Sequence, residues 1–263
     1  MLNSLEEIEA AAIKDPMRVA SLSAKSQLRK RFYQTVSIGK TNNGYYILLD
    51  GKPIKTPSGK QLITPTKDVG VLLAAEWDAQ DGVIDPQTMP TTRLINTSID
   101  GVANDLQPVK DDIVKFSGSD LVCYRADSPA ELVAKQKEHW DPLIDWVEQA
   151  FGARFIVQTG IIHVLQPTES IDRFAGQIDR INCPVALSAL HTVTSITGSA
   201  LIALAIYQGE IEADAGWKAA HVDEDWQISQ WGEDSEAANL RASRAREFNA
   251  AIILMDALKF QST

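Results

Sequence analysis

Carboxylates gather around two tryptophans in residues 221–234, HVDEDWQISQWGED. Carboxylates at this density can form a general acid–base pair, bind a metal, or offer a charged surface to another protein. If residues 215–233 form one helix, several fall within about 40° of one line at 3.6 residues per turn: Trp217, His221, Glu224, Ile228 and Trp231. Opposite them fall Ala215, Ala219, Val222 and Trp226. A surface helix normally has one apolar stripe, so this helix is predicted to be buried on both sides or to contact a partner with its second face.

Glu224 distinguishes these chemistries, because it lies in the middle of the tryptophan stripe, where an unpaired carboxylate is costly to bury. It can accept a hydrogen bond from His221 or an indole, face solvent, or pair with a partner's cation. Asp223 and Asp225 point away from it on such a helix, which leaves no facing pair for acid–base catalysis. A metal ion needs more ligands than one Glu–His pair. We interpret the stretch as a binding surface; the alternative is a hydrolase or isomerase that uses Glu224 with His221.

The motifs of common enzyme classes are absent from the chain. GxGxxG, GxxxxGK[ST], GxSxG and HExxH do not occur, so dinucleotide, P-loop, hydrolase and zincin chemistry lack their usual signatures. His191 and Ser195 are spaced like a base and its nucleophile, but the apolar run around His191 favours a core histidine. Cys123 and Cys183 form no CxxC pair and indicate neither a disulfide framework nor a zinc site. The sequence therefore predicts no catalytic residue, no metal and no organic cofactor.

Short β-prone runs occupy residues 31–64 and are separated by turn sequences. Asp50-Gly51 lies between two of these runs and predicts a tight hairpin, because both turn positions can take positive φ. The chain then changes to helical spacing, with Val69 and Trp77 on one face and Gly82 at the end. Trp77 is therefore expected to anchor this helix to the sheet.

Helices are predicted to dominate the second half of the chain. Ser128, Pro129 and Glu131 form a capping-box pattern, and Pro142 is expected to kink or interrupt the helix that follows. A strand is predicted at residues 120–125, and residues 155–166 are predicted to form either a strand pair or an extended excursion. Further helices are predicted at residues 184–195, 198–208, 212–231 and 234–259.

This order of elements predicts an α+β fold, with strands first and helices later. The predicted division has three parts. Residues 1–30 form an N-terminal arm, residues 31–126 form a β-rich domain with a short meander plus helices, and residues 127–263 form a mainly helical domain.

Charge is distributed unevenly along the 263 residues, whose formal net charge is −10. Residues 1–60 contain ten Lys and Arg against five Asp and Glu, whereas the remainder contains fifteen against thirty. An acidic body disfavours nucleic acids and anionic membranes, because both are polyanions, and it suits a basic protein surface. No apolar run approaches the roughly 20 residues that span a bilayer, and the acidic N-terminus lacks the features of a signal or transit peptide.

Eight short motifs stand in a fixed order between Arg31 and the C-terminus: RFY, LDGKPIKTP, AAEWDAQ, DPQTMPTTRLINTSID, DLVCYRA, HWDPL, GSALIALA and DEDWQISQWGED. Together they resemble the assembly chaperones of F-type ATP synthase. The resemblance implies a monomeric, non-enzymatic chaperone without a cofactor. Such a chaperone holds the unassembled alpha subunit of the catalytic head and prevents its aggregation until it pairs with beta.

The resemblance also implies a location and a contact site. The expected location is the cytoplasm for a bacterial member and the mitochondrial matrix for a eukaryotic one, without membrane insertion. The family's acidic motif lies in its helical C-terminal domain. On the matching positions of this chain, partner contacts are assigned to Glu224, Trp226, Trp231, Glu233 and Asp234.

Overall fold

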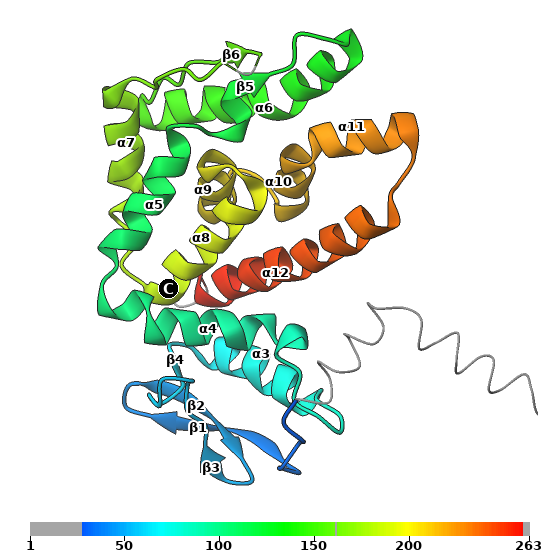
Figure 1. Cartoon of the computed structure of the whole chain (residues 1–263). Coiled ribbons are helices and arrows are strands. Elements are labelled where there is room, and N and C mark those ends of the chain that lie inside the picture. Colours follow the sequence, from blue (N-terminus) through cyan, green and yellow to red (C-terminus); the bar gives the residue numbers. More distant parts are fainter. Residues whose placement is uncertain (1–27, 161, 260–263) are drawn as a thin grey trace, which may run out of the picture.

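A four-stranded antiparallel sheet forms one end of the molecule (Figure 1). The structure is a computed structural model that describes residues 28–160 and 162–259, so most of the predicted arm lies outside the described residues. Strands β1 (Val36–Thr41) and β2 (Gly44–Leu49) pair along their full length. The short strands β3 (Lys52–Pro53) and β4 (Ile63–Thr64) pair with the two ends of β2. Ile47 and Leu49 alternate along β2 and point into the core.

The turn between β2 and β3 is the hairpin predicted at Asp50-Gly51. Asp50 has a φ of 48° and Gly51 a φ of 78°, as a type I′ turn requires, and Leu49 pairs with Lys52. The Asp50 carboxylate accepts hydrogen bonds from the N–H groups of Thr35 at 2.8 Å and Gln34 at 3.0 Å. These two N–H groups hold the pKa of Asp50 below its usual range.

Two helices connect the sheet to the rest of the molecule. Helix α3 (Lys67–Asp78) packs on β1 and β2, and α4 (Pro90–Asp100) packs on α3. Glu76 of α3 joins these helices, because its two carboxylate oxygens accept hydrogen bonds from the N–H groups of Thr91 and Thr92, each at 2.7 Å. The N-terminus of α4 is therefore capped by a side chain from its neighbour.

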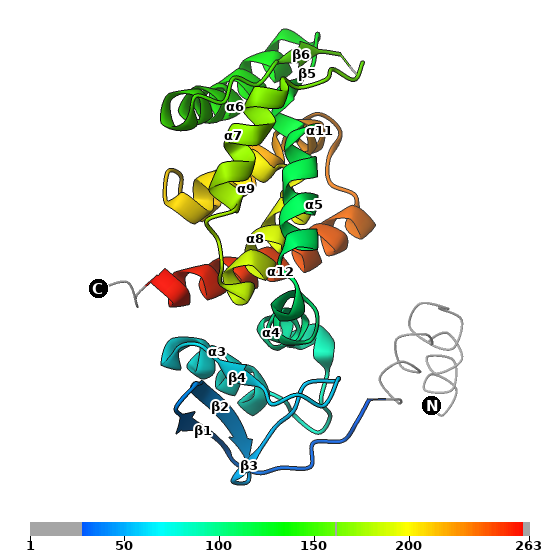
Figure 2. The same ribbon diagram turned by 90° about the vertical axis from the view of Figure 1, so that its left-hand side faces the viewer.

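The remaining helices form a helical part that lies on one side of the sheet, α3 and α4 (Figures 1 and 2). Its helices are α5 (Gln107–Ser117), α6 (Ala130–Phe151), α7 (Thr168–Ile178), α8 (Pro184–Thr197), α9 (Ala200–Gln208), α10 (Ala213–Ala220), α11 (Val222–Trp231) and α12 (Ser235–Lys259). Helix α9 is central: it packs on α5, α6, α8 and α10, and all its residues from Ala200 to Ile206 are buried. No helix among the described residues is long and apolar enough to cross a lipid bilayer.

The last helix reaches back to the sheet end. Helix α12 packs on α8, α4 and α3, and Figure 1 shows it in red and orange between the helical part and α3. Thr66 connects α12 to the start of α3. Its hydroxyl accepts a hydrogen bond from the Val69 N–H at 3.0 Å, as an N-cap, and donates to the carbonyl of Ala257 at 3.3 Å.

The start of α6 differs from the predicted capping box. Pro129 occupies the N-cap position with extended backbone, and the helix begins at Ala130. The Ser128 hydroxyl donates to the Asp127 carboxylate at 3.0 Å and does not cap the helix. Pro142 lies inside α6 without interrupting it, since its neighbours Trp140 and Leu143 are buried and hold the helix in place.

Only short strands form within residues 120–125, where a strand was predicted, and within residues 155–160, where a strand pair or an extended excursion was predicted. A 3₁₀ turn, η3 (Leu121–Cys123), precedes β5 (Tyr124–Arg125), which pairs in parallel with β6 (Gln158–Thr159). Residues 162–166 form no strand. The Gln166 side chain instead accepts from the N–H of Ile156 at 2.7 Å and donates to its carbonyl at 3.0 Å. One amide side chain thus satisfies the backbone groups that a second strand would have paired.

The single helix predicted at residues 212–231 is two helices, α10 and α11, which meet at His221. His221 has a φ of −116° and a ψ of 19°, outside the α-helical range. Its ring Nδ1 lies 2.8 Å from the Trp217 carbonyl, and its backbone N–H donates to Lys218. In a continuous helix, the Trp217 carbonyl would accept a hydrogen bond from the backbone N–H of His221. The His221 ring binds this carbonyl instead, so the helix breaks at His221. The predicted α+β fold, with strands first and helices later, is confirmed.

Candidate functional site

The residues assigned to partner contact lie at one outer corner of the helical part. Glu224, Trp226 and Trp231 belong to α11, and Glu233 and Asp234 connect α11 to α12. Figure 1 shows this connection in orange, at the edge of the molecule and remote from the sheet. We call these five residues the α11 corner.

The break at His221 divides the predicted tryptophan stripe into a buried and an exposed part. The Trp217 ring packs on His221, with ring centroids 3.9 Å apart, and edge-on against Phe248 of α12 at 5.1 Å. His221 is 5% exposed, whereas Trp231 is 75% exposed. The continuous stripe from Trp217 to Trp231 is therefore wrong, because the chain changes direction between them, and only its α11 half faces solvent.

Glu224 is partly exposed and weakly held. Its side chain is 36% exposed, and Oε2 lies 3.9 Å from Nε2 of His221, beyond hydrogen-bonding distance. No described residue donates a hydrogen bond to its carboxylate. The Glu224 charge is therefore available to an external cation.

The two tryptophans of the α11 corner contact each other. Trp226 and Trp231 pack edge to face, with ring centroids 5.5 Å apart and planes at 90°. The indole N–H of Trp226 is buried and finds no acceptor among the described residues. Trp231 covers its neighbour with one edge and exposes most of its surface, which is an unusual arrangement for the largest apolar side chain.

The other acids of the stretch have structural partners. Asp223 accepts a hydrogen bond from the buried Gln136 amide at 2.7 Å, and Asp225 pairs with Arg241 of α12 at 2.6 Å. Asp234 caps α12, because its Oδ1 accepts from the N–H groups of Glu236 at 3.0 Å and Ala237 at 2.9 Å. This cap was not predicted, although an aspartate directly before a long helix is its usual signal. The exposed Glu233 completes the corner.

The geometry around His221 and Glu224 does not favour the alternative hypothesis of a hydrolase or isomerase. A cavity of about 220 Å³ beside α11 is lined by residues including His139, Asp225 and Trp226, but neither His221 nor Glu224 lines it. Within residues 28–160 and 162–259, no cluster of three or more His, Cys, Asp or Glu could hold a metal ion. The arrangement suits contact with another macromolecule better than chemistry on a small substrate.

His191 does have an acidic partner that sequence spacing did not indicate. Its Nε2 lies 2.8 Å from Oδ2 of Asp112, which comes from α5, while Ser195 is exposed one turn further along α8. The contact between His191 and Asp112 therefore links α5 to α8, two helices that pack on each other.

The fold and the α11 corner together define an α+β protein whose candidate site is a surface for another protein. The family model described as ATP12 chaperone protein matches residues 30–148. Among solved structures, the Atu1473 protein of Agrobacterium tumefaciens is 47% identical with a TM-score of 0.85, covering 93% of this chain and 92% of that one. Atp12 from Paracoccus denitrificans is 34% identical with a TM-score of 0.81, covering 87% and 98%.

A curated relative is more distant. Protein atp12, mitochondrial, of Schizosaccharomyces pombe is 24% identical over 220 residues, which cover 79% of this chain and 75% of the relative. The chain belongs to the ATP12 chaperone family. The family confirms the resemblance drawn from the sequence motifs, and the chain is a chaperone of ATP synthase assembly.

Proposed function

We propose that the chain binds the unassembled alpha subunit of the F-type ATP synthase head through the α11 corner and keeps it from aggregating until it pairs with beta. Membership of the ATP12 family supports the role in assembly. The observation that carries the contact site is the 75% exposure of Trp231 beside the unpaired carboxylate of Glu224. The proposed action is binding without catalysis, by a monomer, in the bacterial cytoplasm or the mitochondrial matrix.

The α11 corner has the chemistry of an interaction hot spot. A tryptophan buries about 150–250 Å² in an interface, which at about 25 cal/mol per Å² corresponds to roughly 4–6 kcal/mol before the costs of association. Glu224 lies about two helical turns before this anchor on α11 and Glu233 two residues after it, and both carboxylates can pair with Lys or Arg of the client. Aromatic burial then supplies affinity, and charge complementarity supplies selectivity.

Charge reversal tests the acidic part of the corner. Glu224→Lys and Glu233→Lys are each expected to abolish capture of the alpha subunit while thermal unfolding stays near that of the wild type. An exposed carboxylate costs little to lose in the free chain, whereas a client cation left unpaired in the complex costs roughly 2–5 kcal/mol. A pull-down of the alpha subunit and a thermal melt by circular dichroism, made on the same preparation, separate the two effects.

Three further variants control this experiment. Glu210→Lys makes the same charge change at an exposed position outside the corner and should bind like the wild type. Asp234→Asn removes a charge but retains an N-cap for α12, so it isolates the contact from the cap. Trp231→Ala should weaken binding at least about tenfold without lowering the melting temperature. Wild-type capture by both lysine variants contradicts the proposed site, and a large loss of stability in Glu224→Lys makes that residue a structural acid.

A further inference from the structure

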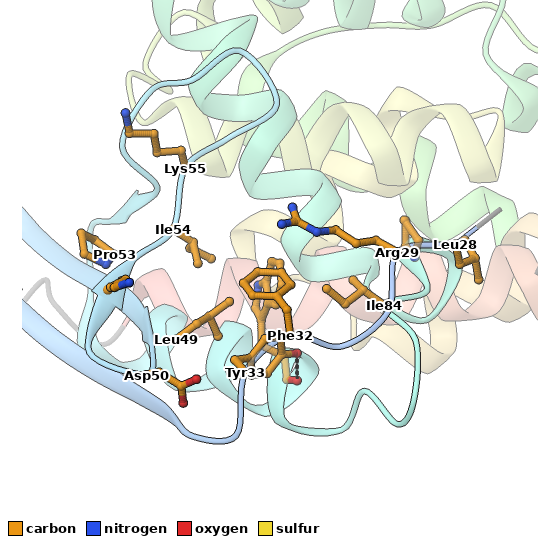
Figure 3. A pocket seen from close by; sticks show the side chains of 13 residues that line it. Leu28, Arg29, Phe32, Tyr33, Leu49, Asp50, Pro53, Ile54, Lys55 and Ile84 are labelled. Carbon is orange, nitrogen blue, oxygen red and sulfur yellow. Dashed lines mark hydrogen bonds between the residues drawn. The ribbon is translucent and has the colours of Figure 1, made fainter.

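A groove of about 720 Å³ lies at the opposite end of the molecule from the α11 corner (Figure 3). Its walls are residues 28–33 on one side and the hairpin residues 49–55 on the other, with Trp77 of α3 and Ile84 completing the lining. This size lies in the range of about 300–1,000 Å³ that is typical of sites for small ligands or a few side chains. Nothing in the chaperone contact proposed above uses it.

Phe32 marks the groove as a binding surface. Its neighbours have structural roles: the Arg31 guanidinium donates to the carbonyl of Asp78 at 2.8 Å, at the C-terminus of α3, and the Tyr33 hydroxyl donates to the carbonyl of Trp77 at 2.5 Å. The Phe32 ring packs edge-on against Tyr33, with centroids 5.4 Å apart, and the Arg29 guanidinium lies 4.2 Å from its centroid. Phe32 is 54% exposed, and Figure 3 shows it in the middle of the groove.

The groove is positively charged in a chain whose formal net charge is −10. Arg29, Lys52 and Lys55 are among its lining residues, and Asp50 is the one acid that lines it. The Asp50 carboxylate is already engaged by the N–H groups of the residues that precede β1. Figure 3 shows Arg29 and Lys55 on opposite walls, with the Arg29 side chain extending over Phe32 and the Lys55 side chain pointing outward at the rim. A complementary occupant therefore carries carboxylates beside apolar side chains.

The chain itself enters at the rim of this groove. Two backbone hydrogen bonds fix residues 29–31 there, from Arg31 N–H to Gly82 at 3.0 Å and from Ile84 N–H to Arg29 at 2.8 Å. Residues 1–27 precede this point, and within them Leu2, Leu5 and Ile8 recur every third residue, interleaved with Glu6, Glu7 and Glu9. Residues 10–27 can span at most about 60 Å, which is ample to return to the groove.

We propose that this groove is the docking site for the chain's own acidic segment, residues 2–9. Its leucines and isoleucine cover Phe32 and the apolar floor, and its glutamates pair with Arg29, Lys52 and Lys55. Because the segment is tethered at the rim, its effective concentration at the groove is in the millimolar range, so even a weak contact is occupied. An external partner with acidic and apolar side chains must displace this segment to use the groove.

Carbodiimide cross-linking of the full chain, followed by peptide mapping, tests the proposal. Glutamates 6, 7 and 9 are expected to join Lys52 and Lys55 within the monomer. The yield should exceed that of the exposed control lysines, Lys40 and Lys67, at least about tenfold, because only the groove lysines meet a docked segment. Equal yields for both pairs of lysines overturn the proposal. Cross-links confined to a dimer, or to a co-purified client, also overturn it, because they assign the groove to a second copy or to the client.

Limited proteolysis of the full chain gives an independent measurement. Replacing both Lys52 and Lys55 by Glu should release the segment and speed cleavage after Glu9 by a glutamyl endopeptidase at least about fivefold. The same replacement of Lys40 and Lys67 changes the charge equally outside the groove and should leave the cleavage rate unchanged. Equal rates in the wild type and both double variants contradict docking. Pull-down of the alpha subunit tests client binding at the α11 corner and is a separate measurement. Failure of either proposal therefore does not contradict the other.

Discussion

A buried carboxyl at the N-terminus of α9 is the clearest titratable group in the core. Asp120 accepts hydrogen bonds from the N–H groups of Leu201 at 3.0 Å and Val122 at 3.2 Å, and the Ser199 hydroxyl accepts one from Ile202 at 3.0 Å. Together they satisfy donors that the first turn of α9 leaves unpaired. Burial raises the pKa of Asp120 to about 6, although the hydrogen bonds act in the opposite direction.

The raised pKa predicts how stability depends on pH at this residue. The folded state binds the proton of Asp120 more tightly than the unfolded chain, whose carboxyl has an ordinary pKa of 3.8. Its contribution is therefore fully present below about pH 4 and is lost as the pH rises through about 6, a change of about 3 kcal/mol. Asp120→Asn does not titrate. The free energy of unfolding of the wild type should thus fall relative to this variant between about pH 4 and pH 7 in denaturant titrations. Parallel pH profiles would contradict the assignment.

Individual site residues were predictable where their role depends on side-chain chemistry alone. The clustering of Glu224, Trp226 and Trp231 follows from their types and spacing in one short stretch. The partial burial of Trp217 and the exposure of Trp231 did not follow, because a helical projection assumes an unbroken helix and His221 breaks it. Phe32 could not be recognised either, because its exposure and its place in the groove depend on residues distant in the sequence.

At the scale of elements, the joint between α3 and α4 depends on one carboxylate. Glu76→Gln keeps the size of the side chain but leaves one oxygen where two N–H groups require acceptors. We expect the free energy of unfolding to fall by about 1–3 kcal/mol, because one helix-terminal donor loses its partner. Chemical denaturation measures this loss. Glu138→Gln, at an exposed position of α6, is the matched control and should change stability little. Equal stability of both variants would show that water replaces the cap.

The elements that were predicted correctly are those whose signals are local. Asp50-Gly51 specifies its turn through the φ angles that these two residues accept, whatever the rest of the chain does. The Ser128 capping box was wrong for the opposite reason, and so was the strand pair, one of the two alternatives at residues 155–166. The Ser128 hydroxyl donates to Asp127 and not to the helix. The Gln166 side chain forms hydrogen bonds with the backbone of Ile156 that a neighbouring strand would have formed. Such competition between side chain and backbone depends on packing that no periodicity contains.

Considered as a whole, the molecule separates its charges. The groove at the sheet end carries cations, and the α11 corner at the other end carries unpaired carboxylates (Figure 1). A client with a basic surface is therefore oriented toward one end of the molecule before contact is made.

This separation predicts that the chaperone–client complex depends on salt. Affinity for the alpha subunit should fall as salt rises from about 0.05 M to about 0.5 M, because the screening length shrinks from more than 10 Å to less than half of that. Calorimetric titrations at several salt concentrations measure the slope. Glu224→Gln and Glu233→Gln each remove one charge without reversing it and should each reduce the slope, whereas Trp231→Ala should lower affinity and retain the slope. A salt-independent wild-type affinity would contradict an acidic contact surface.

The position of α12 determines when the contacts of α3 and α4 can be completed during synthesis. This helix closes against α3 and α4, yet its contact at Ala257 lies 191 residues after Thr66. At about 5–20 residues per second, the ribosome needs roughly ten to forty seconds to make the intervening chain. For that time the newly made α3 and α4 lack the surface that will cover them. Completion of this fold therefore waits for α12, and until then α3 and α4 stay uncovered where α12 will pack.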